Sequence, residues 1–156
     1  IRSMSYQPLR LLARSQEDLQ VFSACLQDAV MKQKDMAFLE ASGVFVLMGN
    51  RFVWEQYLED KTQISRVRCG LRFHGVKKAQ FRGFNIARSE AVQSVLAIAY
   101  ELVNDAQSPI DDADLHHVRI IFSGDCEIRL DVEDCEAILE DIGSPWRAKR
   151  VPQHEV

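Results

Sequence analysis

Residues 44–48, Val-Phe-Val-Leu-Met, are apolar at five consecutive positions, and this run limits the folds open to the chain more than any other feature. Its β-branched and aromatic residues are typical of a strand, and it is far shorter than the ~20 apolar residues that a membrane span needs. A strand that is apolar on both faces needs cover on two sides. The run therefore favours a barrel, or a sheet with a helix packed over it.

Period-two alternation of apolar and polar residues predicts further strands. The pattern is clearest at 67–73 and 126–132, and shorter strand signals occur at 9–14, 36–40, 78–83, 95–102 and 118–123. Turns are expected at 41–43, where Gly43 can take a positive φ, at 74–75 and at 124–125. We expect 67–73 and 78–83 to form a hairpin, and we count seven strands from residue 36 onward.

Two amphipathic helices are expected at the ends of the chain. Ser15 can cap the first helix, which carries apolar residues at spacings of three and four and should end near residue 30. Asp131 can cap the second, whose apolar stripe comprises Cys135, Ile138, Leu139 and Ile142, with Gly143 as its stop. Residues 50–60 are predicted to be a loop or a short helix. Residues 89–103 fit either period, and we favour a helical turn at 89–94 before the strand.

These elements predict one α+β domain over 9–146, followed by a basic C-terminal tail at 147–156. Its core would be a strongly bent antiparallel sheet of about seven strands with an N-terminal and a C-terminal helix. The same order occurs in pleckstrin-homology-like barrels, in which the last helix closes an open end of the sheet; a generic α+β sandwich is the alternative. With neither a spanning segment nor a secretory signal, the expected location is the cytoplasm.

The charges are divided unevenly along the chain. Residues 61–89 carry eight Lys or Arg and no acid, whereas 101–141 carry thirteen acids and two arginines, a local net of −11. On separate faces these stretches would form a large dipole. Arginine side chains suit bidentate phosphate contacts. The predicted basic hairpin over 66–84 is therefore the leading candidate site, with these contacts: Arg66, Arg68, Arg72, Lys77, Lys78 and Arg82.

The partner of this hairpin would be an acidic protein or a phosphate-bearing molecule, nucleic acid included. The function we favour is a non-enzymatic binding or interaction module. A solvated strand face, or pairing with the chain's own acidic stretch, is the simpler explanation of the same charges. A homo-oligomer that joins basic and acidic faces is the second functional reading.

A third reading is an enzyme with a pocket whose rim holds Arg51, Trp54 and Glu55, which follow the most apolar strand. No catalytic motif or glycine-rich phosphate loop supports it, and we predict no cofactor. A metal site is not expected either. The acidic segment at 104–116 and the pair His116 and His117 could supply ligands, but a solvated loop explains them better.

Four segments together resemble a known family. They read Leu-Gln-Asp-Ala-Val at 26–30, Asn-Arg-Phe-Val-Trp-Glu at 50–55, Arg-Leu-Asp-Val-Glu at 129–133 and Pro-Trp at 145–146. The chain is similar, from about residue 9 to 154, to the bacterial domain-of-unknown-function family 2948, found mainly in alphaproteobacteria. Val53 departs from the acidic residue expected there. The resemblance implies one cytoplasmic bacterial domain, brings no activity, and draws attention to Arg51, Trp54 and Glu55.

Overall fold

A computed structural model of the protein describes residues 6–88, 90–102 and 115–153. Its strands are β1 (Arg10–Ala13), β2 (Val30–Leu39), β3 (Val44–Phe52), β4 (Ser65–Phe73), β5 (Val76–Arg82), β6 (Val92–Glu101), β7 (His116–Phe122), β8 (Cys126–Val132) and β9 (Ala137–Arg147). The helices are α1 (Gln16–Cys25), α2 (Trp54–Glu59) and the 3-10 turn η1 (Ile86–Arg88). Within the described residues, nine strands form one antiparallel sheet in the order β1-β9-β4-β3-β2-β6-β7-β8-β5.

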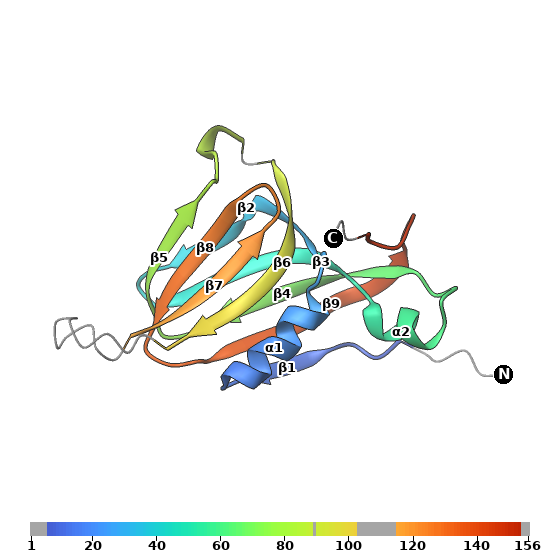
Figure 1. Ribbon diagram of the computed structural model, residues 1–156, viewed down its shortest axis with the longest axis horizontal. Coiled ribbons are helices and arrows are strands. Elements are labelled where there is room, and N and C mark those ends of the chain that lie inside the picture. Colours follow the sequence, from blue (N-terminus) through green and yellow to red (C-terminus); the bar gives the residue numbers. More distant parts are fainter. Residues whose placement is uncertain (1–5, 89, 103–114, 154–156) are drawn as a thin grey trace.

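The sheet bends into two layers that face each other (Figure 1). The first layer comprises β1, β9, β4, β3 and β2, and the second comprises β6, β7, β8 and β5. Buried side chains of both layers, such as Phe45 and Leu71 in the first and Ile120 and Leu130 in the second, share one hydrophobic core. The predicted bent antiparallel sheet is therefore confirmed, and the two helices beside it are consistent with the predicted α+β class.

The bend lies at β2, which pairs with β3 on one side and β6 on the other. Its pairing with β3 shifts register between Met31 and Met36, so the strand kinks there. Gly49 of β3 allows the close approach at this point. A Cβ on Gly49 would lie 2.7 Å from the Met31 side chain and 2.8 Å from the Val30 carbonyl oxygen. Only glycine fits this contact without a shift of the backbone.

Helix α1 begins as predicted, because the Ser15 hydroxyl accepts a hydrogen bond from the Asp18 N–H at 3.1 Å. Leu19 and Phe22 are buried in the core between the layers. The helix ends at Cys25, five residues earlier than expected, and β2 starts at Val30 instead of residue 36. Residues 54–59 form the short helix α2, one of the two predicted alternatives.

The predicted C-terminal helix is wrong: these residues form β9. The residues at 135–142 fit the helical spacing of three and four, but they also fit the spacing of two that a strand has. Ala137, Leu139 and Asp141, at every second position, are buried. β9 lies between β1 and β4 and pairs with both. Two hydrogen-bonded neighbours favour the strand over an isolated helix.

Other details of the predicted fold also differ. The helical turn favoured at 89–94 is replaced by β6 from Val92 onward. Within the described residues the sheet has nine strands in place of about seven. The last described element along the chain is the strand β9, so the described part of the chain has no terminal helix that closes the sheet as in a pleckstrin-homology-like barrel. The described residues contain no helix with the length and apolar character needed to cross a membrane.

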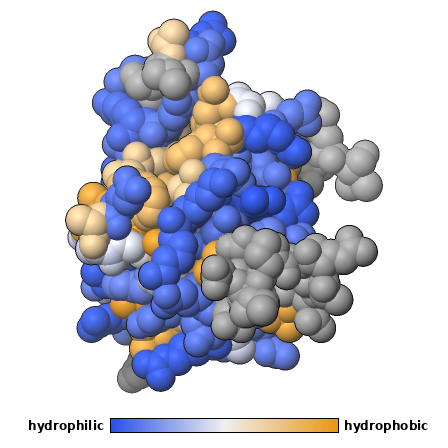
Figure 2. Space-filling model, turned by 90° about the vertical axis from the view of Figure 1, so that its left-hand side faces the viewer, coloured by the Kyte–Doolittle hydropathy of each residue, from blue (hydrophilic) through white to orange (hydrophobic). Residues whose placement is uncertain are grey.

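Figure 2 views the molecule from the side where β5 and the β2–β3 turn lie. This surface is mainly hydrophilic but includes an apolar area. Leu39 of β2 and Phe81 of β5 are about half exposed, and the Phe81 ring lies 5.9 Å from that of Phe45. Aromatic contacts therefore join the edge strand β5 to β3 of the opposite layer.

Candidate functional site

The two basic strands, β4 and β5, are not neighbours in the sheet. β4 pairs with β3 and β9 in the first layer, whereas β5 pairs with β8 in the second. The hairpin predicted over 66–84 is therefore wrong, because the chain crosses between the layers after β4. The candidate contacts separate into two groups: Arg66, Arg68 and Arg72 on β4, and Lys77, Lys78 and Arg82 on β5. Alternation identified both strands but carried no information on their partners.

On the second layer, the basic and acidic stretches of the chain meet across paired strands. Lys78 lies opposite Asp131, and Arg82 lies opposite Glu127. The Arg82 guanidinium is 3.3 Å from the Glu127 carboxylate, and the Lys77 ammonium is 2.8 Å from Glu133. Much of the charge on β5 is thus balanced by the chain's own acids.

The arginines of β4 lie on the opposite layer. Arg66 donates hydrogen bonds to the carbonyl oxygens of Asp28 at 3.2 Å and Asn50 at 3.0 Å. Burial lowers the pKa of Arg66, although the Asp28 charge acts in the other direction, and an arginine remains protonated. Arg68 lies 3.5 Å from Asp35, while Arg72 has no ion pair among the described residues.

A cationic pocket of about 380 Å³ opens where β4 begins and β9 ends. Its lining comprises Arg66, Trp146, Arg147, Ala148, Lys149, Arg150 and Pro152. Trp146 lies directly opposite Arg66 in the β4–β9 pair and is 44% exposed. No carboxylate of the described residues is part of this lining. The pocket therefore combines four cations with one aromatic ring.

The start of the predicted tail is held to the sheet. Arg147 pairs with Ser65, and the Ala148 N–H donates to the Ile64 carbonyl oxygen at 2.8 Å. Ala148 is also buried. This anchoring places the basic residues of the tail beside Arg66, an arrangement that their distance along the sequence did not reveal.

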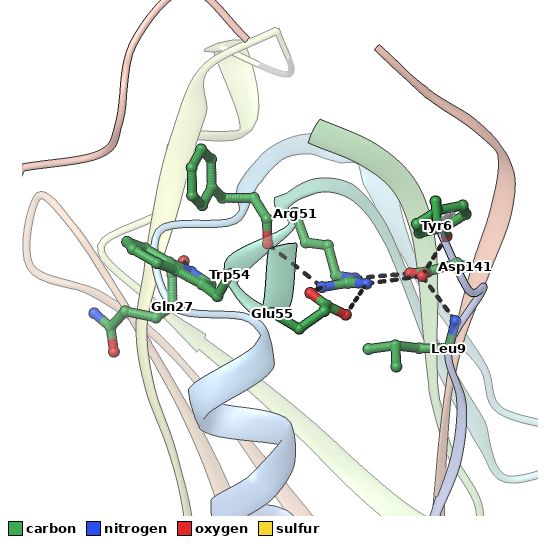
Figure 3. Close-up of polar contacts among 8 residues, drawn as sticks. Tyr6, Leu9, Gln27, Arg51, Trp54, Glu55 and Asp141 are labelled. Carbon is green, nitrogen blue, oxygen red and sulfur yellow. Dashed lines mark hydrogen bonds and ion pairs between the residues drawn. The ribbon is translucent and has the colours of Figure 1, made fainter. Parts of the chain in front are cut away.

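Arg51 of β3 lies at the centre of a buried ionic cluster (Figure 3). Its Nε and one terminal nitrogen donate to the two oxygens of Asp141, each at 2.8 Å, and its two terminal nitrogens donate to Glu55, each at 2.9 Å. A further hydrogen bond runs to the Phe52 carbonyl oxygen at 3.4 Å. All five N–H groups of the guanidinium have partners.

Asp141 receives further hydrogen bonds from the N-terminal segment. Its Oδ2 accepts from the Tyr6 hydroxyl at 2.5 Å and from the Leu9 N–H at 2.9 Å. Burial works to raise the pKa of Asp141, but the hydrogen bonds from Arg51, Tyr6 and Leu9 lower it overall. Burial and the bond to Asp141 raise the pKa of Tyr6, so its phenol remains protonated. The cluster joins the segment before β1 to β3, β9 and α2.

Beside this cluster is an open apolar groove of about 720 Å³. Its lining comprises Leu9, Leu11, Val21, Ala24, Cys25, Gln27, Trp54, Glu55 and Leu58. The Trp54 indole N–H donates to the Gln27 carbonyl oxygen at 2.9 Å, which fixes the ring at the groove (Figure 3). Burial raises the pKa of the Cys25 thiol, and the nearby Arg51 charge opposes this effect.

The sequence singled out Arg51, Trp54 and Glu55 as a pocket rim. Trp54 and Glu55 do line the groove, whereas Arg51 is fully buried beneath it. Sequence reasoning missed Asp141, placed in the predicted helix, and Tyr6, which lies outside the predicted domain. The alternation of Ala137 and Leu139 with Asp141 was the available signal, because it places an acid at an inward position.

Of the residues considered as metal ligands, the structure describes the two histidines but not the acids. His116 and His117 begin β7, and His117 lies 3.2 Å from Asp131. The acids of the segment at 104–116 lie outside the described residues. Within the described residues, no group of three or more His, Cys, Asp or Glu is arranged to hold a metal ion.

Together, the fold and these sites define an α+β protein with a bent antiparallel sheet, a cationic pocket and an apolar groove. The model of the family described as "Protein of unknown function (DUF2948)" matches residues 9–154, so the chain belongs to this family. The match confirms the family to which the sequence was found similar. Neither a curated protein nor a solved structure showed a significant match.

Proposed function

We propose that the protein is a non-enzymatic binding module for a phosphate-bearing partner, with the cationic pocket as its main contact site. The observation that carries this proposal is the lining of the pocket: the described residues supply four cations and a half-exposed tryptophan but no carboxylate. Arginine forks bind phosphate oxygens in pairs, and lysine adds a point charge. A concave surface lined by these cations favours an anion.

The tryptophan makes single-stranded nucleic acid the best match within this class. Proteins that bind single strands combine a positively charged surface with aromatic rings on which bases stack. Trp146 is positioned for such stacking, because it is exposed and lies opposite Arg66. Arg66 is held in place by two backbone carbonyls, so little side-chain entropy is lost when it binds.

The outer face of β4 extends the pocket along the sheet. Arg68 and Arg72 alternate with the buried Cys69, Leu71 and Phe73, so they share the outer face with Arg66. Residues two apart on a strand are separated by about 7 Å, which is close to the spacing of phosphates along a strand. Lys77, Lys78 and Arg82 are assigned no contact in this proposal, because they lie on the other layer.

The test is fluorescence anisotropy with labelled single- and double-stranded oligonucleotides at low and moderate salt. We expect the single strand to bind more tightly, with affinity falling by about 0.7 log units per log unit of salt for each phosphate contacted. The triple variant Arg147→Glu, Lys149→Glu, Arg150→Glu should weaken binding at least about tenfold, since it removes several phosphate contacts. Trp146→Ala should weaken it further than Trp146→Phe, which keeps an aromatic face.

The matched control is the triple variant Lys77→Glu, Lys78→Glu, Arg82→Glu, which changes the net charge by the same amount on β5. This variant should bind nearly as well as the unaltered protein. Equal losses in the two triple variants would show that total charge, and not the pocket, governs binding. The absence of binding at low salt would overturn the proposal.

A further inference from the structure

The apolar groove at β1, α1 and α2 shares no lining residue with the cationic pocket, and its charge has the opposite sign. We propose that this groove is a second binding site, for a small amphiphile that has an apolar body and one cationic group. The inference does not rest on the phosphate-binding proposal.

The lining accounts for the apolar part of the ligand. Leu9 and Leu11 of the N-terminal segment, Val21 of α1 and Leu58 of α2 supply aliphatic surface around the Trp54 ring. Val21 and Leu58 are more than half exposed, an unfavourable position for large apolar side chains that a bound apolar group would relieve. The volume of about 720 Å³ lies within the ~300–1,000 Å³ of small-molecule sites.

The buried cluster accounts for the cationic part. Among the described residues, Glu55 is the one charged side chain in the lining, and this side chain is 44% exposed. Arg51 cannot bind an anionic ligand from the groove, because it is fully buried and all its donors point to other acceptors. One guanidinium faces two carboxylates, Glu55 and Asp141, so the cluster has an excess of one negative charge. That charge lies at the edge of the groove.

The position of the charge is also fixed. Both Glu55 oxygens accept hydrogen bonds from Arg51 at 2.9 Å, so the carboxylate is held at the groove and does not swing into solvent. Cys25 brings no second charge, because burial raises the pKa of its thiol. A protonated amine or quaternary ammonium on an apolar chain therefore fits the groove better than a carboxylate of the same length.

The experiment compares decyltrimethylammonium with decanoate by isothermal titration calorimetry at pH 7, below the concentrations at which either forms micelles. We expect the cation to bind roughly tenfold more tightly, from one charge pair partly exposed to water. In a Trp146→Phe background, Trp54 is the single tryptophan of the chain, and its fluorescence should change on binding. That change places the probe in the groove.

Glu55→Gln should bring the affinities for decyltrimethylammonium and decanoate to within about twofold of each other. In this variant the positive charge of Arg51 is balanced by the negative charge of Asp141, so the cluster has no net charge. Glu59→Gln is the matched control: it removes an exposed acid of the same helix that does not line the groove, and the preference should persist. In the unaltered protein, added salt should weaken the binding of decyltrimethylammonium more than the binding of decanoate. This comparison needs no variant. Tighter binding of decanoate, a preference unaffected by Glu55→Gln, or no change in Trp54 fluorescence would each overturn the proposal.

Discussion

Arg51 of β3 and Asp141 of β9 form a doubly hydrogen-bonded ion pair across strand β4, which lies between their two strands in the sheet. Arg51 is opposite Val67 of β4, and Asp141 is opposite Cys69. The guanidinium therefore passes over the buried side of β4 to reach the carboxylate. With Tyr6 and Leu9 bonded to the same carboxylate, this pair ties the N-terminal segment to the centre of the first layer.

Replacing Arg51 should strongly destabilise the protein. Arg51→Met leaves the buried Asp141 without its cation, and breaking a buried pair from one side costs roughly 3–5 kcal/mol. Urea unfolding followed by circular dichroism measures the change in the free energy of unfolding. Asp141→Asn should cost less, because the amide oxygen still accepts a hydrogen bond and Arg51 keeps Glu55.

The exposed pair Lys34 and Glu90 provides the control for this prediction. The Lys34 Nζ is 2.9 Å from a Glu90 carboxylate oxygen, close to the 2.8 Å between Arg51 and Asp141, but both side chains of this pair face water. Lys34→Met should change the unfolding midpoint little. A similar loss in Lys34→Met and Arg51→Met would mean that burial does not set the importance of the ion pair.

The Asp141 carboxylate should also control stability in acid. Its pKa in the folded protein lies below the ordinary value of 3.8, so the folded state favours the ionised form. The resulting stabilisation is fully present above that ordinary value and is lost as the pH falls through the lower, folded pKa. The unfolding free energy of the unaltered protein should therefore fall more steeply below about pH 4 than that of Asp141→Asn. Parallel curves between pH 2 and 6 would contradict this assignment.

Gly49 should tolerate no side chain at the bend of β2. An alanine Cβ would press on both the Met31 side chain and the Val30 carbonyl oxygen, and overpacking of this kind costs roughly 1–3 kcal/mol. Gly70→Ala is the comparison, because its Cβ would meet the flexible Met48 sulfur at 3.2 Å. Thermal unfolding of the two variants should show the larger loss for Gly49→Ala. The opposite order would contradict the close approach of β2 and β3.

The elements of this fold were more predictable than their partners. The alternation at 67–73 and 126–132 identified β4 and β8, and Ser15 marked the start of α1. The pairing of β4 with β9 joins residues far apart in the sequence, and no local pattern specifies such a contact. For the same reason the basic residues at 66–82 separated onto two layers instead of forming one hairpin.

The region around β9 shows how tertiary contacts decide an ambiguous segment. Residues 135–142 satisfy a helical and an extended pattern at once, and the unpaired edges of β1 and β4 select the extended form. This choice brings Asp141 to Arg51 and places Trp146 opposite Arg66. Both candidate sites thus depend on a strand that local periodicity assigned to a helix, although Arg51, Trp54 and Glu55 were recognisable from their position after the apolar strand.

Cys25 should react with thiol reagents before the other three cysteines. It is half-buried at the apolar groove, whereas Cys69, Cys126 and Cys135 are buried. Burial raises the pKa of Cys69 to about 12 and, with the nearby acids, that of Cys135 to about 11, which further limits their thiolate fraction. Labelling with 5,5′-dithiobis(2-nitrobenzoate) at pH 8 should show one fast phase that is absent in Cys25→Ser.

The rate of this phase should increase with pH, because the pKa of the Cys25 thiol is itself raised. Decyltrimethylammonium should slow the same phase if the probe occupies the groove. A fast phase that persists in Cys25→Ser would show that another thiol is accessible and would contradict the burial of the core cysteines.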